Sequence, residues 1–380
     1  MKVPMLDLVA QYQPIKEEID QAVAKVIQSG QFILGPEVSA LEQELADYCQ
    51  CAHAVGVASG TDALHLALRA CGIGEGDGVI TSPFTFIATA EAISYLGAIP
   101  IFLDIDQESF NLDPNQVEDF LKGRSEVVRS VPKAKPKAIL PVHLYGRSAD
   151  MTALMKLASA FGLKVVEDCA QAIGAEHRGQ RVGSFGDAGC FSFFPTKNLG
   201  GYGDGGMVTT RDAHLAEQVR ILRQHGSRTR YYHKELGFNS RLDEIQAAIL
   251  RVKLRHLDSW IAGRQEIADL YRSSLRGGSI VVPLDDARGR HIYHQFTIRV
   301  PQRDALQAHL REMGIATMIY YPVPLHQQKA YAHLGYREGD FPQSEKAARE
   351  VLSLPIYPEL TPEQAGFAGE AILDFFQPAS

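Results

Sequence analysis

The sequence predicts an α/β protein built on a mostly parallel sheet of seven strands flanked by helices. Seven short apolar runs with strand character recur in the first part of the chain, and helical patterns such as 61–71 and 151–161 separate most of the first five. Such alternation is typical of a parallel sheet with helices on its faces. The strand-like runs lie at 54–59, 78–82, 99–105, 138–144, 164–168, 188–194 and 206–210.

A smaller C-terminal α/β domain is expected to follow. A helical pattern without proline runs over 241–275, and we expect it to leave the large domain and enter the small one. Beyond it the sequence predicts a strand at His291–Val300, a helix at Arg303–Met313 and a strand at Ala316–Tyr320. Within the sheet, the last two runs are so close in sequence that one of them is expected to be antiparallel.

Length and composition limit the class of protein. The 380 residues fit two units, which we place at residues 1–250 and 251–380. Hydrophobic residues make up 45% and charged residues 22%, as in an ordinary globular protein. The net charge of −7 argues against nucleic acid as a partner. Without a membrane-spanning apolar run or a signal-peptide core, the sequence predicts a cytoplasmic protein.

The cysteines favour reduced thiols over disulfides or a metal. There are five, an odd number, scattered through apolar segments. Cys49 and Cys51 have the wrong spacing for a zinc site. We therefore expect no metal.

A single lysine, Lys197, stands between a short aromatic strand and a glycine-rich stretch that ends at Gly206. Burial lowers the pKa of a lysine and leaves a free amine that can bond to an aldehyde. Glycines allow the main chain to approach a flat ligand closely. Taken alone, the stretch could equally be a glycine-rich turn with a solvated lysine.

The strand at 164–168 supports a cofactor site because it ends in Asp168, where ligands of open α/β sheets bind. A carboxylate on one strand end and a lysine after a later strand are the two groups that pyridoxal 5'-phosphate (PLP) requires. The lysine holds the aldehyde carbon, and the carboxylate keeps the pyridine nitrogen protonated. Gln171 is placed to bond the ring oxygen. The alternatives are a helix N-cap for Asp168 and a surface position for Gln171.

A phosphate site is expected where a buried strand is followed by Gly60 and Thr61 and then by an apolar-periodic helix. Helix N-termini bind phosphates through free N–H groups, although Thr61 or Ser59 could serve only as an ordinary N-cap. Ser192, five residues before the lysine, could add a hydroxyl. We expect Phe86 to cover the ring face, with Phe84 as the second choice.

These motifs resemble the DegT/StrS type of PLP-dependent nucleotide-sugar aminotransferases, which belong to fold type I of the aspartate aminotransferase superfamily. Two departures are small: Cys169 stands where alanine is usual, and Gly78 replaces a common acidic residue. The resemblance covers nearly the whole chain. Its motifs are Leu34–Val38, Ser59–Leu64, Glu167–Gln171, Ser192–Lys197, Gly237–Ala248 and Tyr321–His326.

The resemblance implies transfer of an amino group from glutamate or glutamine to a keto-sugar of a nucleotide-linked hexose, for a surface polysaccharide or a glycosylated metabolite. It also implies a homodimer with shared active sites, in which Asn239 reaches the PLP phosphate of the other subunit. From the residues alone, Asn239 or Ser240 could simply cap a helix. Segment 239–243 looks like the form seen in 3-aminating relatives, so we expect amination at C3, with Tyr232 and His233 in the sugar pocket.

A loop with two prolines, 320–326, is expected to wall the sugar-nucleotide site with Tyr321 and His326, because proline forbids regular pairing there. A packed proline turn with an exposed histidine is the other interpretation.

Two rival functions remain. A PLP-dependent sugar dehydratase of the same family would carry histidine in place of Lys197. A regulatory protein without turnover would not need Lys197, Asp168 and Ser192 together.

Overall fold

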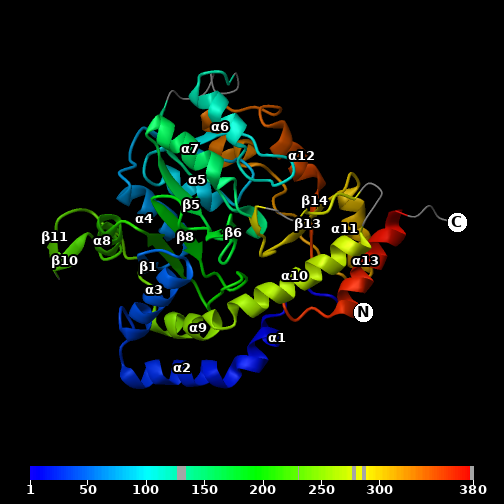
Figure 1. The fold of residues 1–380 in the computed structure, drawn as a ribbon, viewed down its shortest axis with the longest axis horizontal. Coiled ribbons are helices and arrows are strands. Elements are labelled where there is room, and N and C mark those ends of the chain that lie inside the picture. Colours follow the sequence, from blue (N-terminus) through cyan, green and yellow to red (C-terminus); the bar gives the residue numbers. More distant parts are fainter. Residues whose placement is uncertain (126–133, 230, 276–279, 285–287, 377–380) are drawn as a thin grey trace.

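Seven strands form one sheet at the centre of the computed structural model (Figure 1). The structure describes residues 1–125, 134–229, 231–275, 280–284 and 288–376. In sheet order the strands are β1 (His53–Val57), β9 (Gly206–Thr210), β8 (Ala188–Ser192), β5 (Lys164–Asp168), β4 (Lys135–Ile139), β2 (Asp77–Thr81) and β3 (Ile99–Phe102). Strand β9 runs antiparallel to both of its neighbours and the other pairs are parallel. The predicted fold class, with one antiparallel strand among the last two, is confirmed.

Helices cover both faces of this sheet. The first helices are α1 (Leu8–Tyr12), η1 (Gln13–Ile15), α2 (Lys16–Ser29), α3 (Pro36–Tyr48), α4 (Gly60–Ala70) and α5 (Ile87–Ser94). They are followed by α6 (Pro114–Leu121), η3 (Leu144–Gly146), α7 (Met151–Phe161), α8 (Ala213–Leu222), α9 (Glu244–Leu254) and α10 (Leu257–Ser274). Short strands β6 (Glu176–His177), β7 (Gln180–Arg181) and β12 (Gly289–Arg290) pair together, and β10 (Ser227–Thr229) with β11 (Tyr232–His233) forms a hairpin.

Alternate residues of each strand enter different cores, since successive side chains point to opposite faces of a sheet. In β1, Val55 and Val57 pack with α4, α5 and α8, whereas Ala54 packs with α3 and α9. In β5, Val166 lies on the first of these faces and Val165 packs with α6 and α7 on the other. This covering on both faces explains why the strands are almost continuously apolar.

A second core lies in the C-terminal part. It is built by α11 (Arg303–Glu312), α13 (Pro362–Phe376) and the strand pair β13 (Phe296–Arg299) and β14 (Val351–Leu354). Between α11 and β14 lie η4 (Leu325–Gln327), η5 (Lys329–Leu334) and α12 (Pro342–Glu350).

The pattern predicted over 241–275 forms two helices, α9 and α10, which meet near Arg255 and His256. Helix α10 joins the two cores, because Leu257 and Ile261 pack with the sheet while Tyr271 packs in the C-terminal core. Val3 also belongs to the C-terminal core. The division at residues 250 and 251 stays a prediction.

Two expectations for the small domain need correction. The strand predicted at His291–Val300 is limited to 296–299, because the preceding residues pair with the turn at 144–146 through Ile292 N–H to Gly146 O and Gln295 N–H to Tyr145 O. The predicted strand Ala316–Tyr320 is absent among the described elements, where Met318 makes only a single bridge to Ser353. Strand β14 pairs with β13 instead.

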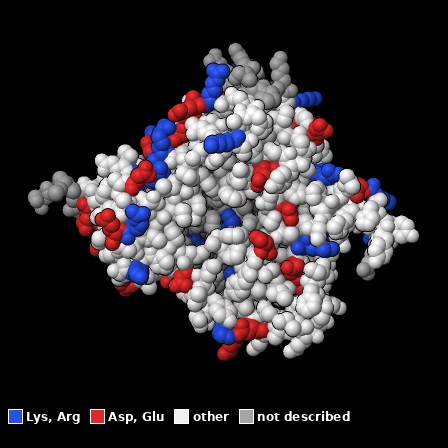
Figure 2. All heavy atoms as spheres, turned by 180° about the vertical axis from the view of Figure 1, so that it is seen from behind, with Lys and Arg blue, Asp and Glu red and all other residues white. Residues whose placement is uncertain are grey.

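The surface carries mixed charge. On the face drawn in Figure 2, acidic and basic side chains are interspersed over most of the surface, which suits the small negative net charge of the chain. Within the described residues, none of the helices combines the length and apolar character needed to cross a membrane.

The start of α3 is held by a buried carboxylate from another helix. Glu244, the first residue of α9, is 1% exposed and accepts hydrogen bonds from the backbone N–H groups of Gly35, Glu37 and Val38 at 2.7, 2.8 and 2.9 Å. Amides at a helix N-terminus have no acceptor within their own helix, and the helix dipole favours an anion there.

We expect Glu244→Gln to lower the free energy of unfolding by about 2–4 kcal/mol, because the new amide sets an N–H group against one of these buried donors. Denaturant unfolding followed by circular dichroism measures the change. The matched control is Glu217→Gln, which breaks the exposed pair with Arg228 (3.0 Å) and should cost less than about 0.5 kcal/mol. Equal losses in the two variants would contradict this role of Glu244.

Candidate active site

A cavity of about 470 Å³ opens at the carboxyl ends of β5 and β8, beside the N-terminus of α4. Eight of the residues proposed from the sequence line it. They are Gly60, Thr61, Phe86, Asp168, Gln171, Ser192, Lys197 and Tyr321. Segments that are distant in the sequence therefore converge on one site, at the sheet edge where ligands of open α/β folds bind. The cavity has space for a drug-sized ligand.

Asp168 ends β5 and is 5% exposed. Its Oδ2 accepts a hydrogen bond from Thr89 Oγ1 at 2.8 Å, and its Oδ1 accepts one from the Ala170 N–H at 3.1 Å. Burial raises the pKa of this carboxyl, and the two hydrogen bonds together with the Lys197 charge oppose that rise. The carboxylate is thus an acceptor fixed in direction, suited to a cationic N–H group of a ligand.

Lys197 follows β8 in a tight turn in which its backbone N–H donates to Phe194 O at 2.8 Å. Among the described residues its ammonium has no hydrogen-bond or ion-pair partner. Burial lowers the pKa of this amine to about 8, against the opposing attraction of Asp168. A lysine in this state supplies a free amine close to neutral pH, as a nucleophile or proton carrier requires.

The N-terminus of α4 forms part of the cavity wall. Ser59 caps the helix by accepting from the Asp62 N–H at 3.0 Å, so the amides of Gly60 and Thr61 precede the first helical hydrogen bond. A β-carbon on Gly60 would lie 2.6 Å from the Ser192 Cβ, and only glycine permits this approach of α4 to β8. Two amides and two hydroxyls, those of Thr61 and Ser192, therefore meet at one place.

Gln171 is fixed by two neighbours in the cavity wall. Its Oε1 accepts from the Tyr145 N–H at 2.8 Å, and its Nε2 donates to the Tyr321 hydroxyl at 3.0 Å. Burial raises the pKa of Tyr321 far above its usual range, so the phenol stays neutral. Among the described residues, the second hydrogen of the Gln171 amide has no acceptor, and it can donate to a ligand oxygen.

Of the two phenylalanines weighed for the ring face, Phe86 lines the cavity and is 56% exposed, at the N-cap of α5. Phe84 is 1% exposed and packs against Phe110 and Tyr321, with ring centroids 6.1 and 6.3 Å apart. The structure therefore makes Phe84 a core residue.

Four proposed residues do not line this cavity. Asn239, Tyr232 and His233 are exposed, and the last two lie on the β10–β11 hairpin at the edge of the molecule (Figure 1). His326 is buried, with its Nε2 3.1 Å from Glu345 Oε1, because the turn η4 directs it into a core with Phe341. The expectation that His326 lines the sugar site is not supported by this position.

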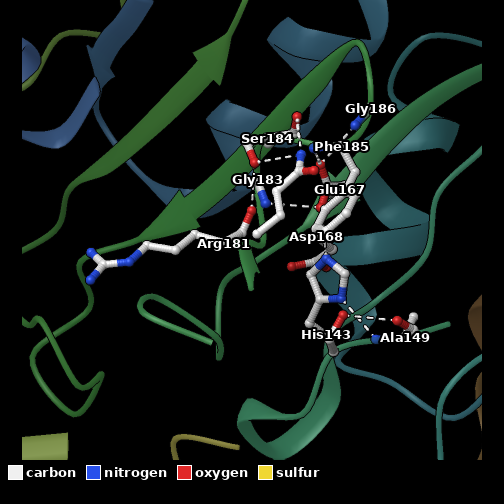
Figure 3. Close-up of polar contacts among 12 residues, drawn as sticks. His143, Ala149, Glu167, Asp168, Arg181, Gly183, Ser184, Phe185 and Gly186 are labelled. Atoms are coloured by element: carbon white, nitrogen blue, oxygen red, sulfur yellow. Dashed lines mark hydrogen bonds and ion pairs between the residues drawn. The ribbon is translucent and has the colours of Figure 1, made fainter. Parts of the chain in front are cut away.

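Next to Asp168, Glu167 anchors the same strand end from the other face (Figure 3). Its fully buried carboxylate accepts from His143 Nε2 at 3.0 Å and from the backbone N–H groups of Gly183, Phe185 and Gly186 at 2.8, 2.8 and 2.9 Å. With four donors the carboxylate is satisfied. His143, Glu167 and Cys169 offer ligand atoms within 4.8 Å of one another, but these contacts give the cluster a structural rather than a metal-binding role.

Sequence reasoning missed several wall residues, among them Thr89, His294, Gln295 and Tyr320. Thr89 lies three residues after Phe86, in the first turn of α5. Its position in a strand–loop–helix pattern, next to the residue proposed to stack on the ring, could have indicated that it lines the site. His294 and Gln295 lie inside the segment 291–300, for which the sequence predicts a regular strand. The alternation of side chains in a strand gives no sign that one of them contacts a ligand.

An α/β fold that brings an amine of lowered pKa, a buried carboxylate and a helix N-terminus to one cavity is typical of enzymes that bind a phosphorylated aldehyde cofactor. Residues 13–372 match the DegT/DnrJ/EryC1/StrS aminotransferase family, and the chain belongs to this family.

Relatives with curated names match this chain over almost its full length. A pleiotropic regulatory protein of Geobacillus stearothermophilus is 52% identical over 99% of both chains. A UDP-N-acetyl-3-dehydro-α-D-glucosamine 3-aminotransferase of Acidithiobacillus ferrooxidans is 50% identical over 95% of both. Among solved structures, DesV of S. venezuelae in complex with a ketimine intermediate superposes with a TM-score of 0.94 at 46% identity, covering 100% of both chains. The predicted family and fold type are thereby confirmed.

The low pKa of Lys197 can be tested in cofactor-free protein. Trapping of this lysine by acetaldehyde and cyanoborohydride, read out by peptide mass spectrometry, should rise with pH to a midpoint of about 8 rather than 10.5, because only the neutral amine reacts. In Asp168→Asn the midpoint should move to lower pH, since the carboxylate favours the protonated amine. A midpoint near 10.5 would show that burial does not control this amine, and a midpoint unchanged in Asp168→Asn would show that the carboxylate does not act on it.

Proposed function

We propose that the protein is a PLP-dependent aminotransferase that moves an amino group from glutamate or glutamine to the keto carbon of a nucleotide-linked hexose, at C3. The observation that carries the proposal is the pairing of Lys197 and Asp168 in one cavity of a chain that belongs to an aminotransferase family. Cofactor chemistry follows the family, whose solved members include an enzyme of Bacillus subtilis with bound PMP, 31% identical to this chain.

The residues present fit PLP. Lys197 would hold the aldehyde end, Asp168 the pyridine nitrogen, Gln171 the ring oxygen and Phe86 the ring face. The helix amides with Thr61 and Ser192 would bind the phosphate. When bound, the cofactor supplies a ring that withdraws electrons from the carbon bearing the amino group.

The chain's own contribution is proton transfer and orientation. With a pKa of about 8, the Lys197 Nζ can take up a proton and return it near neutral pH. The Thr89 hydroxyl keeps the Asp168 carboxylate aimed into the cavity, at 2.8 Å. Asp168 is buried and Lys197 half-buried, which limits the access of water to the reacting atoms.

Amination at C3 is supported by the names of relatives. Besides the Acidithiobacillus enzyme, a dTDP-3-amino-3,4,6-trideoxy-α-D-glucose transaminase of Streptomyces venezuelae is 48% identical over 96% of this chain. An enzyme of this kind would serve amino-sugar synthesis in the cytoplasm, for a polysaccharide or a glycosylated metabolite. The dehydratase alternative is disfavoured by Lys197. The regulatory alternative, which the name of the Geobacillus relative favours, is disfavoured by the complete set of Lys197, Asp168 and Ser192.

We also propose a homodimer with shared sites. Asn239 is exposed, and the hairpin with Tyr232 and His233 lies at the edge of the subunit (Figure 1). None of these three residues lines the cavity of its own subunit. In a dimer these residues would complete the site of the other subunit, with Asn239 at the phosphate and the two aromatic residues at the sugar.

Turnover of nucleotide sugars is the direct test of function. With glutamate as donor, the wild type should aminate a 3-keto nucleotide hexose faster than its 4-keto isomer, measured by mass spectrometry of the product. Lys197→Ala should lose at least about a thousandfold in kcat, because the proton carrier is removed. Preference for the 4-keto isomer would overturn the C3 assignment, and full activity in Lys197→Ala would overturn the mechanism.

Subunit mixing tests the shared site. A Lys197→Ala chain and an Asn239→Ala chain, refolded together, should regain activity, since one of the two sites in each heterodimer is intact. Each variant measured alone sets the baseline, and PLP affinity from absorbance titration shows how much Asn239→Ala weakens binding. If that weakening is clear and the mixture shows no recovery, Asn239 acts within its own subunit.

A further inference from the structure

His294 enters the cavity on a backbone that is fixed on several sides. The segment before β13 pairs with the turn η3, as described above, and the buried Arg264 Nη1 donates to the carbonyls of Tyr293 and His294 at 3.1 and 3.4 Å. The His294 side chain is 6% exposed and lines the cavity that holds Lys197. His294 takes no part in the proton transfer and cofactor orientation proposed above.

The hydrogen bonds of Asn198 determine which nitrogen of His294 carries a proton. Asn198 Nδ2 donates to Ile292 O at 3.3 Å, so its Oδ1 is the atom that lies 3.0 Å from His294 Nδ1. A carbonyl oxygen can only accept, and Nδ1 must therefore carry the hydrogen. The imidazole Nε2 is left with an unshared electron pair.

The imidazole is also held neutral. Burial, followed by the charges of Lys197 and Arg264, lowers the pKa of His294 well below its usual range. Among the described residues, Nε2 has no hydrogen-bond partner, and Lys197 does not lie within hydrogen-bond distance of it. The cavity wall thus presents a neutral acceptor beside the reactive amine.

We propose that His294 Nε2 accepts a hydrogen bond from a hydroxyl group of the bound hexose, which makes His294 a specificity-determining residue for the sugar. This inference rests on the proposed function and names one contact within it. A neutral acceptor repels the carboxylates of the amino donor, whereas a hexose offers hydroxyl donors. A buried acceptor without a donor is unfavourable, so the site discriminates against sugars that lack this hydroxyl.

The test combines a variant with deoxy substrates. UDP-N-acetyl-3-dehydro-glucosamine and its 4-deoxy and 6-deoxy forms are compared in the wild type and in His294→Phe, by KM in turnover and by calorimetric Kd on the cofactor-loaded protein. With the full sugar, His294→Phe should raise KM and Kd about five- to tenfold. With one of the two deoxy sugars, KM and Kd of the wild type should rise by the same factor. The KM and Kd of His294→Phe should be the same for that deoxy sugar as for the full sugar.

The glutamate half-reaction, followed by the cofactor absorbance, should stay within about twofold in His294→Phe. The conservative variant His294→Gln keeps an acceptor oxygen and should recover part of the affinity, and it serves if the phenylalanine variant does not fold. His333→Phe, an exposed histidine of η5, is the matched control and should change nothing.

Three results with His294→Phe, each relative to the wild type, would overturn the inference. The KM for the full sugar could be unchanged, the KM could rise by the same factor for all three sugars, or the glutamate half-reaction could be slowed by that factor. The last would place the contact on Lys197 or the cofactor. If the wild type aminates neither these sugars nor the dTDP-linked 3-keto hexoses, the proposed function fails and this inference with it. If the wild type turns these sugars over and His294→Phe has the same KM and Kd for them, this inference alone is overturned.

Discussion

The site depends on the burial of two adjacent carboxylates at the end of one central strand. Glu167 and Asp168 point to opposite faces of the sheet, and an anion out of water requires donors that replace its hydration. Glu167 obtains four of them from a histidine and from backbone amides, all belonging to the fold (Figure 3). Among the described residues, Asp168 obtains only two donors, and it faces the cavity. One carboxylate therefore fixes the strand, and the other is left with capacity for a ligand.

Close packing of backbone explains why Lys197 lies where it does. Glycine at position 60 lets α4 approach β8, and a β-carbon on Gly206 would overlap the Ser59 carbonyl. The buried ammonium of Lys253 donates to Gly200 O at 2.6 Å and so holds the glycine-rich turn from beneath. The lysine that follows β8 is thereby held in the cavity that the α4 N-terminus and Asp168 also line.

The sheet and the cofactor site could be predicted from the sequence because both leave a local pattern. Strands buried on two faces are continuously apolar. Asp168 ends such a strand, and Gly60 and Lys197 follow shortly after others. What could not be predicted depends on tertiary pairing. His294 faces the cavity because its segment pairs with residues 144–146 instead of continuing β13, and His326 turns into a core formed by residues far along the chain. The positions of these two side chains do not follow from the residues close to each histidine in the sequence.

The segment that carries Asn239 also connects the phosphate end of the cavity to the outer surface. Ser240, its neighbour, is buried, donates to Asp62 Oδ2 at 2.7 Å and accepts from the Ala58 N–H at 3.1 Å. Asp62 lies in the first turn of α4, whose first residues, Gly60 and Thr61, line the cavity. Adjacent residues in extended backbone point in opposite directions, so the anchoring of Ser240 inward is what presents Asn239 outward. In a dimer with shared sites, the seating of α4 in one subunit would consequently set the position of the asparagine that serves the other.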